Sequence, residues 1–374
     1  MKYYIIAGEA SGDLHASNLM KELKANDPKA DFRCWGGDLM AAQGGDIVKH
    51  YRELAFMGFA EVIVNLNTIL SNIKFCKQDI LQFNPDAIVL VDYPGFNLRI
   101  AEFSKKEGFK VFYYISPQIW AWKQSRVYKI KKFVDRMFVI LPFEKDFYKR
   151  YDVDVEFVGH PLLDMIAQLP DNDPVSFRKK NKLSDNPIIA LLPGSRKQEI
   201  KKMLSVMLEV IPDFPDYQFA VAGAPSIEND FYENIIHGKN ARLVSGQTHA
   251  LLQNAYGAMV TSGTATLETA LFGVPEVVCY KGSYVSYQIA RRVIDQSIIK
   301  FISLVNLIVD REVVKELIQD DFNTKNLKEE LKLITKNQAK RNQQLEDYKI
   351  LQARLGGKGA SKKTAQFILN FLEV

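Results

Sequence analysis

The sequence predicts an α/β protein made of two doubly wound, Rossmann-like domains that face each other across a cleft. Continuous apolar segments of strand length alternate with helical stretches, which is typical of a parallel sheet covered on both faces. The alternation stops once, over 167–187, where Pro, Asp and Asn gather, and then restarts. A length of 374 residues also exceeds what one hydrophobic core usually organises.

The domain boundaries follow from this pattern. We expect an N-terminal domain over 1–166, a linker over 167–187, a second domain over 188–345 and, over 346–374, a C-terminal helix packing back on the N-terminal domain. The predicted strands of the first domain are 2–8, 87–92, 110–116, 136–141 and 156–161. Those of the second are 188–194, 217–223, 241–246, 257–263 and 275–280. Ligands bind such sheets beyond the carboxyl ends of the strands.

Composition excludes several classes of protein. Hydrophobic residues make up 47% and charged residues 25%, as in soluble globular enzymes. No apolar run approaches the roughly 20 residues of a membrane span, and the N-terminus lacks the features of a secretory signal. The three Cys residues lie far apart without a CxxC pair, which indicates a reducing compartment. We therefore expect a cytoplasmic protein.

Two motifs of the second domain predict a phosphate site. In LLPGSRKQE (191–199), a buried strand ends at Gly194 and Ser195, and Arg196 opens a helix. Backbone N–H groups, the helix dipole and a guanidinium would then converge on one anion. The alternative is a capped helix with a solvent-exposed Arg.

The second motif follows the strand of 257–263. Ser262, Gly263 and Thr264 are small residues at a helix N-terminus, where N–H groups bind phosphate oxygens. Glu268 lies one turn behind Thr264, on the same helix face, and is suited to two ribose hydroxyls. The alternative is an ordinary surface Glu.

Two strand ends of the first domain carry acids. The turn GEASGD (8–13) could bring N–H groups near Ser11 to an anion, whereas a tight turn capped by Ser11 or Asp13 explains it equally well. We also expect Glu9 to have a polar partner, because a carboxylate in a buried strand-to-helix turn usually needs one. In VDYPGFN (91–97), Asp92 is a candidate general base or a simple turn residue.

Metal and nucleic-acid sites are not expected. The five His residues form no cluster with carboxylates, and His160 fits a structural role better than a catalytic one. Between 104 and 150, 12 Lys and Arg residues outnumber 4 acids, and Trp120, Trp122 and Tyr128 are interleaved with them. This stretch suits a solvated helix face with its aromatic residues in the core, or else an anionic membrane surface, an anionic substrate or nucleic acid. No usual RNA-binding signature accompanies it.

Several motifs between residues 5 and 308 together resemble the lipid-A-disaccharide synthase family, in that family's order. They are IIAGEASGD, ELAFMGFAEV (53–62), SPQIWAWKQSRVYKI (116–130), LPFEKDFY (141–148), FVGHPLLD (157–164), LLPGSRKQEI, SGTATLE and SLVNLI (303–308). From about residue 320 onward, only length and helicity match.

The resemblance implies an inverting glycosyltransferase of the B-type (GT-B) fold. It would transfer 2,3-diacylglucosamine from its UDP conjugate to 2,3-diacylglucosamine 1-phosphate, giving the β-1,6 disaccharide 1-phosphate and UDP in Gram-negative lipopolysaccharide synthesis. Asp92 would be the base, Arg196 would neutralise the leaving diphosphate without a metal or other cofactor, and Asn306 would lie near the donor. Glu9, Ser11, Gly194, Ser195, Ser262, Gly263, Thr264 and Glu268 complete the expected substrate-binding set. Many members have DxPDFN, with a second acid where this chain has Gly95.

The resemblance also implies partners. We expect the two lipid substrates, peripheral association with the anionic inner face of the inner membrane, and no nucleic acid. Part of the apolar segment 56–75 is either an exposed lid that dips into the membrane or holds an acyl chain, or a core helix of the first domain. A homodimer formed by exchange of the last helix is left open. The alternative functions are another UDP-sugar enzyme of the same fold, such as a UDP-N-acetylglucosamine 2-epimerase or a lipid-linked glucosaminyltransferase, and, from another class, a nucleic-acid-binding protein.

Overall fold

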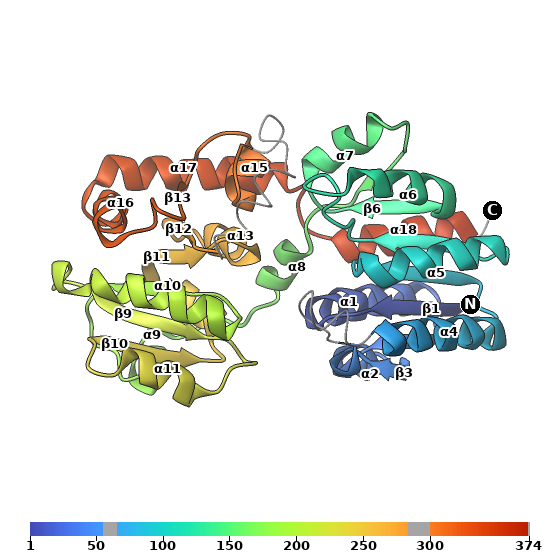
Figure 1. The fold of residues 1–374 in the computed structure, drawn as a ribbon, viewed down its shortest axis with the longest axis horizontal. Helices are drawn as coiled ribbons and strands as arrows, with labels where there is room; N and C mark the ends of the chain where they lie inside the picture. The colour runs from blue at the N-terminus through green and yellow to red at the C-terminus, as the bar shows by residue number, and fades with distance from the viewer. Residues whose placement is uncertain (55–65, 283–299, 373–374) are drawn as a thin grey trace. The chain divides into compact units, whose positions relative to one another are not determined.

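The computed structural model describes residues 1–54, 66–282 and 300–372. The chain forms two compact units, Met1–Ala167 with Leu355–Val374 and Gln168–Arg354. Each contains one parallel sheet, so the predicted pair of doubly wound α/β domains is confirmed (Figure 1). The motif ELAFMGFAEV and the first half of the predicted lid over 56–75 lie outside the described residues, except for Glu53 and Leu54.

The first sheet has seven strands in the order β3-β2-β1-β4-β5-β6-β7. The strands are β1 (Lys2–Ala7), β2 (Asp31–Gly36), β3 (Asp46–His50), β4 (Ala87–Val91), β5 (Lys110–Tyr114), β6 (Arg136–Val139) and β7 (Glu156–Phe157). The helices are α1 (Ala10–Asn26), α2 (Asp38–Ala42), α4 (Leu66–Phe83), α5 (Pro94–Lys106), α6 (Val127–Phe133), α7 (Pro142–Lys149), α8 (Pro161–Ala167) and α18 (Ala360–Leu372), with short 3₁₀ turns at Tyr51–Glu53 and Gln124–Arg126. The chain order reverses between β1 and β4, so their carboxyl ends flank a topological switch point.

The second sheet has six strands in the order β10-β9-β8-β11-β12-β13, and its switch point lies between β8 and β11. The strands are β8 (Ile188–Leu192), β9 (Gln218–Gly223), β10 (Ala241–Ser245), β11 (Ala255–Thr261), β12 (Glu276–Tyr280) and β13 (Lys315–Ile318). The helices are α9 (Pro174–Lys180), α10 (Lys197–Glu209), α11 (Asn229–Ile236), α12 (Thr248–Asn254), α13 (Thr264–Leu271), α15 (Leu304–Val309), α16 (Thr324–Lys336) and α17 (Gln338–Arg354), with a 3₁₀ turn at Ile211–Asp213.

The central strands are fully buried, as their continuous apolar sequences predict. AIVLV of β4 and IIALL of β8 have every residue in the interior because helices cover both faces of a parallel sheet. Sequence patterning did not identify β2, β3 and β13. In β2, the charged Arg33 interrupts the apolar pattern, and its guanidinium is bound by the carboxylate of Asp79 from α4.

Two segments differ from the expected boundaries. The stretch 167–187 contains α9, and from Gln168 onward it belongs to the second unit. Phe177 of α9 is buried against Ile188 and Ala190, so an apolar anchor holds this polar stretch in place. The chain returns to the first unit at Leu355, because α17 runs to Arg354 within the second unit. There α18 packs against α1 (Figure 1).

Candidate functional site

The first candidate site lies at the carboxyl ends of β1 and β4. Ala7 and Val91 pair at the ends of these adjacent parallel strands, which brings the turns at Glu9 and Asp92 together. Asp92 is half-buried. Burial, together with the negative charge of Glu9, raises the pKa of Asp92 to about 6. A carboxylate with this pKa takes up a proton near neutral pH, as a general base requires.

The structure contradicts the expected cap by Ser11 or Asp13 in the turn GEASGD, and the anion-binding alternative stays a prediction. Glu9 occupies the N-cap position of α1 without a side-chain capping hydrogen bond, and Ser11 is exposed. Asp13 is 2% exposed and accepts hydrogen bonds from the backbone N–H groups of Gly37, Leu39 and Met40. Asp13 therefore fixes the start of α2 and does not cap its own helix.

The second candidate site is a cavity of about 260 Å³ in the second unit, and most of the predicted diphosphate-binding residues line it. It lies at the carboxyl ends of β8 and β11, which pair at Leu192 and Val260. Its lining includes Gly194, Ser195, Glu199, Thr248, Ser262, Gly263, Thr264 and Glu268. The N-termini of α10 and α13 begin at this edge, so both direct N–H groups and positive dipole ends toward the cavity's loops.

Arg196 lies at the N-cap of α10, and its side chain is exposed. Within the described residues, its guanidinium makes no ion pair, so the charge is available to a ligand. Gly194 has φ +107°, and a Cβ there would collide with the Glu199 carboxylate. That carboxylate accepts a hydrogen bond from the Ser195 N–H at 3.3 Å, a position that suits an anionic ligand.

Asn306 is fully buried, and its amide is saturated within the fold. The amide Nδ2 donates to Val314 O and Glu316 Oε1, while its Oδ1 accepts from the N–H groups of Val313 and Val314. Glu316 also accepts from the N–H groups of Ile302 and Ser303.

This network reaches the cavity through a backbone group. The Ser262 hydroxyl donates a hydrogen bond to the Ile302 carbonyl at 3.1 Å. Asn306 thus supports the backbone beside the cavity from within the protein interior, and its side chain has no hydrogen-bonding capacity left for a ligand.

Sequence reasoning missed His249 at this site. The Nε2 atom of His249 lies 3.9 Å from Glu268 Oε1, and its ring stacks on Phe272. His249 lies in the first turn of α12, just after β10, so the carboxyl-end rule would have pointed to it.

A buried acid, Glu144, lies near the SPQIWAW stretch. Glu144 accepts hydrogen bonds from the N–H groups of Ile140 and Leu141, and burial raises the pKa of its carboxyl to about 8. Ser116 and Tyr148 share a hydrogen bond of 2.8 Å under the same loop. The aromatic residues of the stretch divide, because Trp120 is buried whereas Trp122 and Tyr128 are exposed by 48% and 64%.

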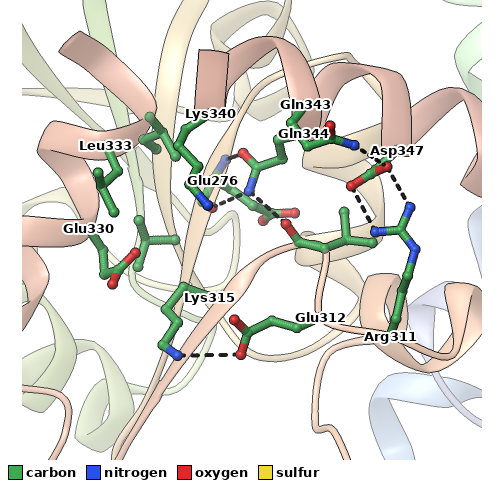
Figure 2. A pocket seen from close by; sticks show the side chains of 13 residues that line it. Glu276, Arg311, Glu312, Lys315, Glu330, Leu333, Lys340, Gln343, Gln344 and Asp347 are labelled. Atoms are coloured by element: carbon green, nitrogen blue, oxygen red, sulfur yellow. Dashed lines mark hydrogen bonds and ion pairs between the residues drawn. The ribbon is translucent and has the colours of Figure 1, made fainter. Parts of the chain in front are cut away.

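A further cavity of the second unit, of about 340 Å³, lies at the opposite edge of the sheet, where β12 begins (Figure 2). Its charged side chains largely pair with one another: Arg311 binds Asp347, and Lys315 lies 3.4 Å from Glu312. Glu276 is buried, and among the described residues neither of its carboxylate oxygens has a hydrogen-bond partner. Because this cavity lies where β12 begins, it is separate from the predicted nucleotide site at the carboxyl ends of β8 and β11.

Neither a membrane-spanning helix nor a metal-binding cluster was found among the described residues. No described helix is both long and apolar enough to cross a bilayer. No described group of three or more His, Cys, Asp or Glu side chains could hold a metal ion. His160 is buried, and its Nδ1 accepts a hydrogen bond from the N–H of Leu162.

Solved structures define the class of fold. The UDP-N-acetylglucosamine 2-epimerase of Neisseria meningitidis, bound to UDP-N-acetylglucosamine, aligns with a TM-score of 0.69 at 13% identity, covering 99% of this chain and 100% of that one. The calicheamicin glycosyltransferase CalG4 aligns with a TM-score of 0.61 at 14% identity, covering 100% and 98%. The chain has the GT-B fold, which both epimerases and glycosyltransferases use.

Sequence relatives narrow the class to one family. The family model described as lipid-A-disaccharide synthetase matches residues 3–371. The lipid-A-disaccharide synthase of Myxococcus xanthus is 38% identical over 376 residues, covering 98% of this chain and 97% of the relative. That of Syntrophus aciditrophicus is also 38% identical, covering 99% and 97%. The chain belongs to the lipid-A-disaccharide synthase family, as the motifs predicted.

Proposed function

We propose that this protein transfers 2,3-diacylglucosamine from its UDP conjugate to the 6-hydroxyl of 2,3-diacylglucosamine 1-phosphate, releasing UDP. The observation that carries the proposal is the family match over residues 3–371, which includes the Asp92 turn and both diphosphate loops. The same match favours this reaction over an epimerase or another glucosaminyltransferase.

In the proposed mechanism, Asp92 takes the proton of the acceptor 6-hydroxyl while that oxygen attacks the anomeric carbon of the donor. The bond from that carbon to the diphosphate oxygen breaks, and the electron pair leaves with UDP. Attack from the face opposite the leaving group inverts the anomeric centre. The Arg196 guanidinium and the N–H groups at the starts of α10 and α13 then stabilise the negative diphosphate.

Asp92 suits the base better than an acid at position 95 would. A side chain at Gly95 would meet no atom within 4 Å, and this position is exposed. A carboxylate there would be solvated and would keep an ordinary, low pKa. The Gly at this position is therefore compatible with activity.

The test is UDP release in EDTA with both lipids, with either lipid alone, and with Asp92→Asn. We expect release only with both lipids, unaffected by EDTA, and a loss of about 10³-fold in kcat for Asp92→Asn because general-base catalysis contributes this order. Wild-type turnover by Asp92→Asn would refute the assignment of the base. Release without the acceptor would instead favour a hydrolase or an epimerase-like enzyme.

We propose that the enzyme works on the anionic inner face of the inner membrane, to which both lipids anchor. Exposed Trp122 carries the cations of Lys123 and Arg126 against its ring, at 4.7 and 5.4 Å from the centroid. Amphipathic aromatic rings beside basic residues are suited to an anionic headgroup layer. On α4, Leu70 and Phe75 add exposed apolar side chains.

Vesicle flotation tests this surface. Trp122→Ala with Lys123→Ala should reduce binding to phosphatidylglycerol vesicles several-fold, while exposed Val175→Ala in the second unit should not. Equal binding by all three proteins would remove the Trp122 surface from the proposal. Light scattering on the same proteins without vesicles distinguishes a monomer from the dimer that exchange of α18 would form.

A further inference from the structure

The turn between β4 and α5 has a strained backbone. Asp92 and Tyr93 follow one another with φ of 45° and 49°, and both are in the left-handed region. Each such non-glycine residue costs about 1–2 kcal/mol, so this pair persists only if its surroundings hold it. Strain of this kind concentrates where a functional group must be aimed.

Two side chains hold this turn. Asn97, fully buried in the first turns of α5, donates hydrogen bonds from Nδ2 to the carbonyls of Val91 and Asp92 at 3.2 and 2.7 Å. The Tyr113 hydroxyl of β5 donates to the same Asp92 carbonyl at 2.5 Å. Reversing the Asn97 amide would place its oxygen against two carbonyl oxygens, so the orientation of this amide is fixed.

The result is a defined position for the residues on either side. The Tyr93 ring packs on Gly8, where a Cβ would lie 2.4 Å from the ring, and it stacks on Phe96 with centroids 5.6 Å apart. Gly8 directly precedes Glu9, so this contact places the Glu9 turn beside Asp92. The influence of Glu9 on the pKa of Asp92 follows from that placement.

We propose that Asn97 and Tyr113 are positioning residues for Asp92. By binding its carbonyl they hold the left-handed turn, and so fix the direction and the partial burial of the Asp92 carboxylate. Neither needs to touch a substrate. The inference rests on the proposed role of Asp92 as the base.

The proposal predicts two effects that a purely structural role would not produce together. If the turn relaxes, the carboxylate moves from its reacting geometry, and kcat falls while substrate affinity stays the same. The carboxylate also gains water and moves away from Glu9, so its pKa falls from about 6 toward the ordinary aspartate value.

Three variants of the full-length protein test this. Asn97→Leu removes both donors at similar volume, and Tyr113→Phe removes one hydroxyl. Tyr114→Phe is the matched control, because this adjacent tyrosine is equally buried and bonds Ser361 on the opposite face of the sheet. For each we would measure kcat, KM, UDP affinity, thermal stability and, by ¹³C NMR of labelled aspartate, the Asp92 pKa, assigned with Asp92→Asn.

We expect kcat to fall about 10- to 100-fold in Asn97→Leu and about 2- to 10-fold in Tyr113→Phe. UDP affinity should stay within twofold, the Asp92 pKa should fall in both variants, and Tyr114→Phe should change neither kcat nor this pKa. Folded variants with unchanged kcat and Asp92 pKa would overturn the proposal, as would the same losses in Tyr114→Phe.

Two outcomes are separable from the proposal. If Asn97→Leu does not fold, the comparison of Tyr113→Phe with its control Tyr114→Phe tests the proposal alone. If the wild-type protein transfers no sugar, the proposed function fails, whereas the Asp92 pKa in the same variants still tests whether Asn97 and Tyr113 hold the turn.

Discussion

The candidate base of the first unit and the diphosphate loops of the second are built in contrasting ways. Asp92 lies on a strained turn whose carbonyl accepts two side-chain hydrogen bonds, and its carboxylate is half-buried. Arg196 and Ser195, by contrast, are exposed on a glycine-containing loop, and the Arg196 guanidinium lacks a partner among the described residues.

The difference fits the two chemical tasks proposed for these residues. The carboxylate of a general base must keep a fixed orientation and a raised pKa, which requires buried neighbouring groups that hold it in place. A diphosphate site must admit one anion and release another in every cycle, which requires donors that solvent can reach. Three experiments sharpen or break this contrast.

Among these three experiments, the largest effect is expected at the exposed loop. Arg196→Ala should lower kcat about 10²-fold, because in the proposed mechanism the guanidinium stabilises charge that develops on the leaving diphosphate. Lys197→Ala is the matched control, since this neighbouring cation pairs with Glu228 at 2.8 Å. Steady-state UDP release measures both. Equal losses in the two variants would mean that only general positive potential matters.

A smaller effect concerns Glu199, whose carboxylate accepts the Ser195 N–H. If diphosphate takes that N–H, Glu199→Gln should bind UDP about fivefold more tightly, because about 1 kcal/mol of repulsion is removed. Calorimetric titration with UDP measures this. Weaker binding would instead show that Glu199 preorganises the loop for its ligand.

The smallest effect is a shift in pH dependence. Because Asp92 must be deprotonated to act, kcat should decline as the pH falls through about 6. Glu9→Gln removes a negative charge that raises this pKa, so the acid limb should move to lower pH while the plateau changes little. A pH–rate profile from 5 to 8 tests this expectation. An unmoved limb would show that burial alone sets the Asp92 pKa.

Much of the fold was predictable because its signals are local. In IIALL followed by PGS, and in GAMVT followed by SGT, a buried strand, a turn and the start of a helix lie within a few residues of one another. The predictions failed where a charge belonged to a distant partner, as for Arg33 of β2 with Asp79. They also failed at Phe177, which gives the polar stretch before β8 a core anchor.

The sequence by itself determined the two parallel sheets, the loops that follow their strands, and the family, because apolar periodicity and short motifs are properties of neighbouring residues. Only the tertiary structure decided which side chains support these loops. Asn97 from a helix and Tyr113 from a separate strand both donate to the Asp92 carbonyl. The Asn306 amide makes all of its hydrogen bonds to groups within the protein interior. Hydrogen-bond partners of this kind depend on how helices and strands pack, which no local pattern records.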